Sequence, residues 1–178
     1  IIKEGLRGQT SNPTIFHKAI SESTDYSKQI EKLAKEGKSI LEIYDALTIK
    51  DVQDACDLFR EVYNSSNGVD GYVSLEVSPY LAHNTEVTLS EARRLFTAVD
   101  RPNCYIKIPG TPAGIPAIEQ ALYEGINLNV TLLFSIKAYE DVACAFVNAL
   151  ERRHSEGKPI NKIASVASFF LSRIDILA

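Results

Sequence analysis

The sequence has 178 residues, of which 45% are hydrophobic and 24% are charged, a composition typical of globular proteins. Its formal net charge is −4 and no run of lysine and arginine stands out, so neither nucleic acid nor an anionic membrane surface is an expected partner. No apolar stretch approaches the roughly 18 residues that a membrane-spanning helix needs.

The three cysteines are widely spaced and lack the paired spacing of metal ligands: Cys56, Cys104 and Cys144. They are expected to be free thiols in a reducing compartment, which favours a cytoplasmic location. The three histidines do not cluster along the chain, so the sequence gives no support for a metal hydrolase.

Short apolar segments that end at proline, serine or glycine recur along the chain and predict β-strands. The predicted strands are residues 6–10, 71–78, 104–109, 127–134 and 162–170. The segments between them have helical periodicity, including a long helix after Ser135. Within these segments, Thr48 with Asp51 is interpreted as an N-cap with an acidic first turn, and Thr88 with Glu91 as a capping box.

Alternation of strands and helices predicts a parallel sheet covered by helices. In three strands, aliphatic side chains alternate with polar ones: Ser74 and Glu76, Tyr105 and Lys107, Asn129 and Thr131. An open doubly wound sheet has helices on both faces, so its strands would be apolar on both. A barrel can carry polar groups inside, near its C-terminal mouth. The sequence therefore predicts an α/β protein with a (β/α)8 TIM-barrel fold, forming one partial domain over residues 1–178.

The predicted barrel is incomplete, because five strands are visible and eight need about 250 residues. Open terminal strands would present unpaired edges. The chain is therefore expected to be a fragment or to need a partner segment, and pairing with a second copy is left open.

Lys107 lies inside an apolar strand. It could be a solvated lysine on an edge strand, or a buried amine that attacks a carbonyl carbon. Glu76, Asn129 and Thr131 share its inward parity on neighbouring strands. Because a core does not bury that many polar groups without a use, this grouping favours the reactive lysine.

Each neighbouring polar residue also has a structural alternative. Glu76 could be an ion-pair partner of Lys107 or a general acid/base. Asn129 and Thr131 could cap strand ends, or they could hold a water molecule or a substrate hydroxyl. Asn12 precedes Pro13, where asparagine often serves only to form a turn.

Five segments, in this order along the chain, resemble the motifs of the transaldolase family: residues 10–16 (TSNPTIF), 73–79 (VSLEVSP), 106–111 (IKIPGT), 125–135 (GINLNVTLLFS) and 165–175 (SVASFFLSRID). The resemblance covers almost the whole chain. It implies a class I aldolase on a (β/α)8 barrel that needs no metal or organic cofactor. Such an enzyme moves a dihydroxyacetone unit between sugar phosphates in the non-oxidative pentose phosphate pathway.

The resemblance also implies roles for individual residues. Lys107 matches the lysine that forms the Schiff base, and Glu76 with Thr131 matches the pair that holds the water used for proton transfer. Asn12 and Asn129 match residues that hydrogen-bond the dihydroxyacetone moiety.

Three residues near the end of the chain match the family's substrate-binding segment: Ser168, Phe170 and Arg173. In the family this arginine helps to hold the substrate phosphate, which a planar guanidinium can grip with paired hydrogen bonds. The alternative for Arg173 is a solvated side chain at a helix start.

The chain departs from the family in three respects. The family's first strand carries an aspartate that acts as acid/base, and the matched region begins after it. The chain thus corresponds to about strands two to six, without the last two strands and their phosphate ligands, so we expect it to be inactive alone. Gly110 stands where alanine is usual.

Two other functions compete with transaldolase. Another class I aldolase, of the fructose-6-phosphate or deoxyribose-phosphate type, would share the lysine chemistry but protonate the enamine. A non-catalytic incomplete barrel would only bind a partner. The order of the five segments favours transaldolase.

Overall fold

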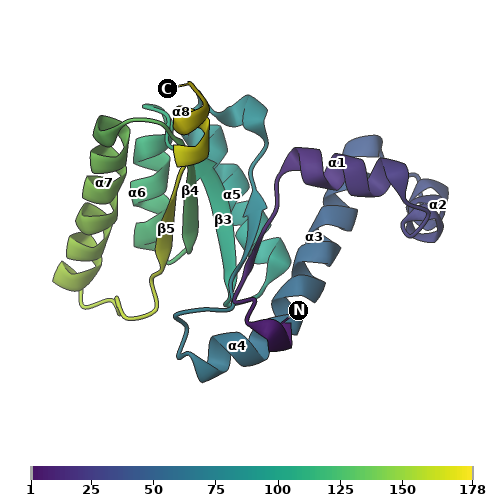
Figure 1. Cartoon of the computed structure of the whole chain (residues 1–178), viewed down its shortest axis with the longest axis horizontal. Helices are drawn as coiled ribbons and strands as arrows, with labels where there is room; N and C mark the ends of the chain where they lie inside the picture. The colour runs from purple at the N-terminus through teal and green to yellow at the C-terminus, as the bar shows by residue number, and fades with distance from the viewer. Residues whose placement is uncertain (1, 178) are drawn as a thin grey trace. The chain divides into compact units, whose positions relative to one another are not determined.

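The computed structural model describes residues 2–177, apart from the side chains of residues 173, 174 and 177. It contains five parallel strands in the order β1-β2-β3-β4-β5; Figure 1 labels β3, β4 and β5. This arrangement confirms the predicted α/β class and is consistent with part of a (β/α)8 barrel. The chain divides into two compact units, which are described separately: Ile1–Leu75 with Ala98–Cys104, and Glu76–Thr97 with Tyr105–Ala178.

The first unit is mainly helical. Its elements are a 3-10 turn η1 (Ile2–Glu4), β1 (Gln9–Thr10), α1 (Pro13–Glu22), α2 (Ser27–Lys35), α3 (Ile40–Leu58), α4 (Arg60–Ser65) and most of β2 (Val73–Glu76). β1 pairs with β2 in parallel, with Gln9 opposite Val73. Its longest helix, α3, buries Leu47, Val52 and Cys56 on one face, which is the helical spacing of an amphipathic helix.

Helix α3 begins at Ile40 and is capped by Ser39, not by Thr48. Ser39 accepts from the backbone N–H of Glu42, and the Glu42 carboxylate accepts from the backbone N–H of Ser39 at 2.9 Å, a capping box. The predicted N-cap at Thr48 is therefore wrong. Thr48 lies inside α3 and its hydroxyl donates to the Tyr44 carbonyl one turn earlier, a bond that threonine commonly makes within helices.

The second unit alternates strands and helices. Its elements are a 3-10 turn η2 (Pro79–Leu81), most of α5 (Thr85–Val99), β3 (Cys104–Pro109), α6 (Gly114–Glu124), β4 (Leu128–Leu133), α7 (Ile136–Ser155), β5 (Ser165–Phe169) and α8 (Leu171–Leu177). Helices α6 and α7 lie side by side against β4 (Figure 1). The core of this unit is aliphatic and fully buried, including Ile106, Ile108, Ile118, Leu122, Leu128, Val130 and Leu133.

Two predicted helix starts in this unit have different outcomes. Ser135 is the N-cap of α7, as expected, and accepts from the backbone N–H of Ala138 at 3.1 Å. The predicted capping box at Thr88 is wrong, because α5 already begins at Thr85. The Asn84 side chain accepts from the Val87 N–H at that helix start.

The predicted strands are in the right places but are mostly too long. The prediction for β3 matches to the residue, and β4 is one residue shorter at each end. β1, β2 and β5 are shorter than predicted. Just before β5, the Ala164 N–H donates to the Asn127 side chain at 2.9 Å. Within the described residues, no helix is both long and apolar enough to cross a membrane.

Candidate active site

Lys107 is in the middle of β3, and only 7% of the residue is exposed. Its Nζ donates to Oε2 of Glu76, the last residue of β2, at 3.1 Å. The Glu76 side chain is 16% exposed. The predicted proximity of the two groups is thus observed, and a solvated Lys107 is wrong. The buried amine can serve as a nucleophile, and the carboxylate beside it can accept the proton that the amine must lose.

Strand β4 brings two more polar residues to the same region. Asn129 lies opposite Lys107 in the parallel register, and Thr131 lies opposite Pro109. Both residues are buried, at 6% and 2% exposure. The Asn129 Oδ1 accepts from the Ser168 hydroxyl of β5 at 2.7 Å. Three adjacent strands therefore place an amine, an amide and two hydroxyl side chains in one region. Sequence parity predicted this grouping for Lys107, Asn129 and Thr131, whereas Ser168 was named only from the family resemblance.

A bulge interrupts β4 immediately after Thr131. The register shifts between Val130 and Leu133, and Leu132 has φ +60°, a left-handed conformation that costs a leucine about 1–2 kcal/mol. Leu132 is 42% exposed while Thr131 and Leu133 are buried. Bulges re-aim the neighbouring side chains, so the strain lies beside a candidate catalytic residue. Nothing in the sequence indicated this bulge.

Gly110 faces the same strand. A Cβ at this position would lie 2.6 Å from Cδ2 of Leu133. The alanine that the family usually has here would therefore require the Leu133 side chain to shift. Gly110 also donates its N–H to the Thr131 carbonyl at 2.8 Å, which fixes the end of β3 against β4.

The segment after β5 holds the remaining predicted substrate residues. The Phe170 ring stacks on that of Phe134, with centroids 5.5 Å apart and planes at 19°. Phe134 is 48% exposed, so the pair forms an aromatic surface at the carboxyl ends of β4 and β5. Arg173 belongs to α8, and its side chain lies outside the described part of the structure.

Asn12 belongs to the first unit, where it serves as the N-cap of α1. Its Oδ1 accepts from the Ile15 N–H at 2.9 Å, and Pro13 occupies the first helical position. Asn12 thus has a structural role, as a helix N-cap and not as the turn former that asparagine before proline suggested. A substrate-binding role for Asn12 stays a prediction from the family resemblance.

The first unit also brings two cysteines together, which their sequence spacing did not indicate. Cys56 of α3 and Cys104 are both fully buried free thiols. A hydrogen bond between the two side chains lowers the pKa of the Cys56 thiol. The same hydrogen bond, together with burial, raises the pKa of the Cys104 thiol. Among the residues whose side chains the structure describes, no group of three or more possible ligands could hold a metal ion.

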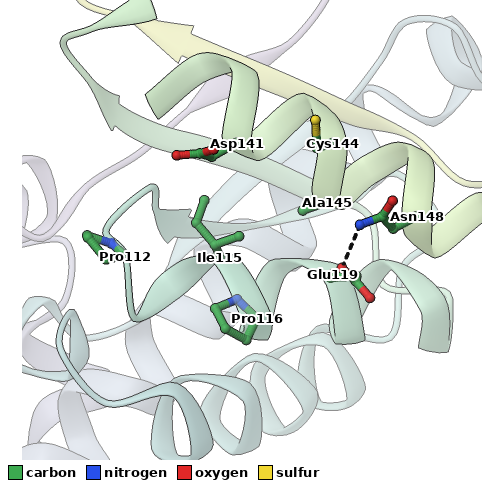
Figure 2. A pocket seen from close by; sticks show the side chains of 8 residues that line it. All are labelled: Pro112, Ile115, Pro116, Glu119, Asp141, Cys144, Ala145 and Asn148. Atoms are coloured by element: carbon green, nitrogen blue, oxygen red, sulfur yellow. Dashed lines mark hydrogen bonds between the residues drawn. The ribbon is translucent and has the colours of Figure 1, made fainter. Parts of the chain in front are cut away.

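The second unit has a separate cleft of about 380 Å³ between α6 and α7 (Figure 2). It is lined by Pro112, Ile115, Pro116, Glu119, Asp141, Cys144, Ala145 and Asn148. Both of its carboxylates are already engaged, Glu119 by Asn148 and Arg152, and Asp141 by Lys137. Exposed, paired charges are an ordinary feature of helix surfaces, so this cleft is not the candidate active site.

Comparison with known proteins agrees with this geometry. The family model described as transaldolase/fructose-6-phosphate aldolase matches residues 1–178. A transaldolase from Trichodesmium erythraeum is 55% identical over 97% of this chain and 46% of its own length. Transaldolase 2 of Nostoc punctiforme is 54% identical over 97% of this chain and 45% of its own length. A transaldolase of Acidothermus cellulolyticus is 54% identical over 94% of this chain and 45% of its own length.

This chain thus spans about half the length of the curated relatives it matches. The family match extends from the segment that contains Asn12, through the strand of Lys107, to the segment that follows β5. Family and fold therefore agree over the whole chain, and the chain belongs to the transaldolase/fructose-6-phosphate aldolase family.

Proposed function

We propose that the protein is a transaldolase. It would transfer a dihydroxyacetone unit from a ketose phosphate (sedoheptulose 7-phosphate or fructose 6-phosphate) to an aldose phosphate, in the non-oxidative pentose phosphate pathway. The observation that carries this proposal is the buried amine of Lys107 in contact with the Glu76 carboxylate. The cytoplasmic location predicted from the cysteines stays part of the same proposal.

The reaction begins at the Lys107 amine. It first gives up a proton, for which Glu76 Oε2 at 3.1 Å is an acceptor within reach. The Nζ lone pair then attacks the ketose carbonyl carbon, and loss of water from the carbinolamine forms an iminium ion. As a base takes the proton of the C4 hydroxyl, the C3–C4 bond breaks and its electron pair moves toward the iminium nitrogen, which leaves an enamine on Lys107 and releases an aldose phosphate. The family resemblance assigns the role of this base to the first-strand aspartate, which precedes the matched region. An incoming aldose phosphate reverses these steps.

The neighbouring residues suit the other requirements of this chemistry. Glu76 and Thr131 would hold the water that moves protons during iminium formation, as the family resemblance implies. Asn129, fixed by Ser168, would bind a hydroxyl of the dihydroxyacetone unit. Their burial supports this assignment, because an enamine must be shielded from bulk water to be transferred rather than hydrolysed. Phe170 and Arg173 would complete the substrate site.

The decisive test is borohydride trapping with fructose 6-phosphate, read by intact mass and peptide mapping. Borohydride reduces the iminium to a stable secondary amine, so trapping requires only iminium formation and not turnover. We expect one covalent adduct on the peptide that contains Lys107. Lys107→Met should abolish it, whereas Lys50→Met, which removes an exposed lysine of the first unit, should leave it unchanged.

An adduct that maps to another lysine, or that persists in Lys107→Met, would remove Lys107 as the nucleophile. If this chain gives no adduct, the same experiment on a version extended at both ends decides the matter. Absence of an adduct on the extended version as well would favour a non-catalytic binding function.

A fructose-6-phosphate aldolase is the second candidate, because the matching family model carries both names. The two activities differ in the fate of the enamine. An aldolase protonates it and releases free dihydroxyacetone, whereas a transaldolase passes it to an acceptor aldose phosphate. Product analysis of an active, extended version with and without erythrose 4-phosphate distinguishes them. Rapid release of dihydroxyacetone as the main product would favour the aldolase.

A further inference from the structure

Two loops that follow the strands of Glu76 and Lys107 are joined by a pair of threonine hydroxyls. Thr111, in the loop after β3, donates its hydroxyl to the carbonyl of Ala82, in the loop after β2, at 2.5 Å. Thr85, at the start of α5, donates to the carbonyl of Ala113 at 2.6 Å. Each side thus gives one hydroxyl and one carbonyl. We call this reciprocal pair of bonds the threonine clasp.

The clasp is closely coupled to Lys107 through the loop after β3. The Thr111 hydroxyl also accepts from the Gly114 N–H at 3.0 Å, at the first residue of α6. A Cβ at Gly114 would lie 2.2 Å from the Pro109 carbonyl oxygen, so α6 begins in direct contact with the end of β3. Only three residues lie between Lys107 and Thr111, so a shift of the clasp is transmitted to the amine through a short segment.

The clasp is coupled to Glu76 on the other side. The N–H of Val77, the residue after Glu76, donates to the Lys107 carbonyl at 3.1 Å. Further along the same loop, the Thr88 hydroxyl donates to the Leu81 carbonyl at 2.8 Å and holds the loop against α5. The backbone next to Glu76 is therefore fixed directly to β3, whereas the Thr88 bond only anchors the far end of the loop to its own helix.

We infer that Thr85 and Thr111 are positioning residues, whose clasp keeps the ends of β2 and β3 at the separation that holds Glu76 Oε2 within hydrogen-bond range of Lys107 Nζ. This inference rests on the proposed function for its chemical meaning. Neither threonine is given a direct contact with substrate. Loss of one hydroxyl would remove one of the two cross-loop bonds and let the Glu76 carboxylate drift from the amine.

The matched variants change only the hydroxyl. Thr85→Val and Thr111→Val keep the side-chain shape and remove the donor, while Thr85→Ser and Thr111→Ser keep the donor. Thr88→Val is the control, because its hydroxyl bonds within one loop and its neighbouring helix rather than across the two loops.

The first readout is independent of catalysis: exchange of the Val77 amide hydrogen, followed by NMR. A net hydrogen bond contributes about 1 kcal/mol, so loss of either cross-loop bond should speed local opening, and hence Val77 exchange, about fivefold. The serine variants should restore the wild-type rate. Thr88→Val should leave Val77 exchange near that of the wild type.

The second readout is the rate of borohydride trapping with fructose 6-phosphate. The two cross-loop valine variants should lower the maximal trapping rate about fivefold and leave the half-saturating sugar concentration unchanged, since they displace Glu76 and not the substrate. Unchanged Val77 exchange in both variants, or an equal change in Thr88→Val, would overturn the inference. If the wild-type chain exchanges as expected but forms no adduct, even in a version extended at both ends, that result would instead count against the proposed function.

Discussion

The two units use their ionisable and strained residues differently. In the first unit, ionisable groups pair near the surface: Lys50 with Asp54, Arg101 with Asp57, and the neutral Tyr26 hydroxyl, which donates to Asp51 at 2.6 Å. In the second unit, Lys107 and Glu76 pair in a largely buried position. Surface pairs contribute little to stability, and a buried pair is costly to desolvate. A buried pair therefore points to chemistry more strongly than a surface pair does.

The backbone shows the same contrast. The first unit has two non-glycine residues at positive φ, Asn67 and Asp100, and these residue types tolerate the left-handed region. The second unit places Leu132 there, within a strand and next to Thr131. Strain of this kind persists only where the surrounding structure enforces it, and it is concentrated at functional sites.

The largest difference should come from replacing one carboxylate by an amide in each unit. Glu76→Gln removes the proton acceptor beside Lys107, so the trapping rate should fall about 100-fold. Asp57→Asn weakens the pair with Arg101, which also holds the pKa of the Asp57 carboxyl below its ordinary value. That change should leave the trapping rate unaltered. Rates are measured with fructose 6-phosphate and borohydride at pH 7.

Equal rates of borohydride trapping in Glu76→Gln and Asp57→Asn would contradict this contrast between the two units. In that case Glu76 would be a structural partner of Lys107 only, which is the alternative that its sequence pattern left open. Circular dichroism of both variants serves as the control, because a rate loss is informative only in a folded chain.

Much of this site could be predicted from the sequence, since parity along a strand is a strong constraint. Lys107, Asn129 and Thr131 came together because parallel strands with aliphatic residues at alternate positions leave the intervening residues on the opposite face. The prediction of β3 was accurate because a mostly apolar segment starts at Cys104 and stops at Pro109 and Gly110.

Other features depended on contacts that no local pattern encodes. A threonine followed three residues later by an acidic residue looks the same at a helix start and inside a helix, so Thr48 and Thr88 were misassigned. The bulge at Leu132 and the hydrogen bond between Cys56 and Cys104 depend on tertiary packing. The two bonds of the clasp likewise join residues that are 28 and 29 positions apart in the sequence.

The strained leucine gives the second prediction. Leu132→Val puts a β-branched side chain at positive φ and should lower the free energy of unfolding by about 1–2 kcal/mol. Leu132→Gly relieves the strain but loses part of a half-buried side chain, so it should lie closer to the wild type. In the first unit, Asn67→Gly should change stability by only a few tenths of a kcal/mol, because asparagine already tolerates that conformation.

Urea titrations followed by circular dichroism measure these differences. Equal stability of the valine and glycine variants would mean that the bulge is not held in the left-handed conformation. The trapping rate of Leu132→Val then shows whether the bulge also aims Thr131, since a purely local loss of stability would leave that rate unchanged.

The smallest effect should come from the Tyr26–Asp51 pair of the first unit. The hydrogen bond to the Asp51 carboxylate raises the pKa of the Tyr26 phenol to about 12, from an ordinary value of 10. Tyr26→Phe removes the bond and should lower the free energy of unfolding at pH 7 by about 1 kcal/mol or less, because the pair is partly exposed. The trapping rate at Lys107 should not change.

The pH dependence fixes the sign of this contribution. A phenol whose pKa is higher in the folded than in the unfolded chain stabilises the fold fully below pH 10, and that stabilisation is lost as the pH rises toward 12. The stability difference between wild type and Tyr26→Phe should therefore be constant from pH 7 to 9 and shrink above pH 10. Urea titrations across this range measure it. A stability difference that stayed constant to pH 11.5 would show that the hydrogen bond to Asp51 does not raise the Tyr26 pKa. The Tyr26–Asp51 pair would then no longer show that the first unit uses an ionisable group for stability alone.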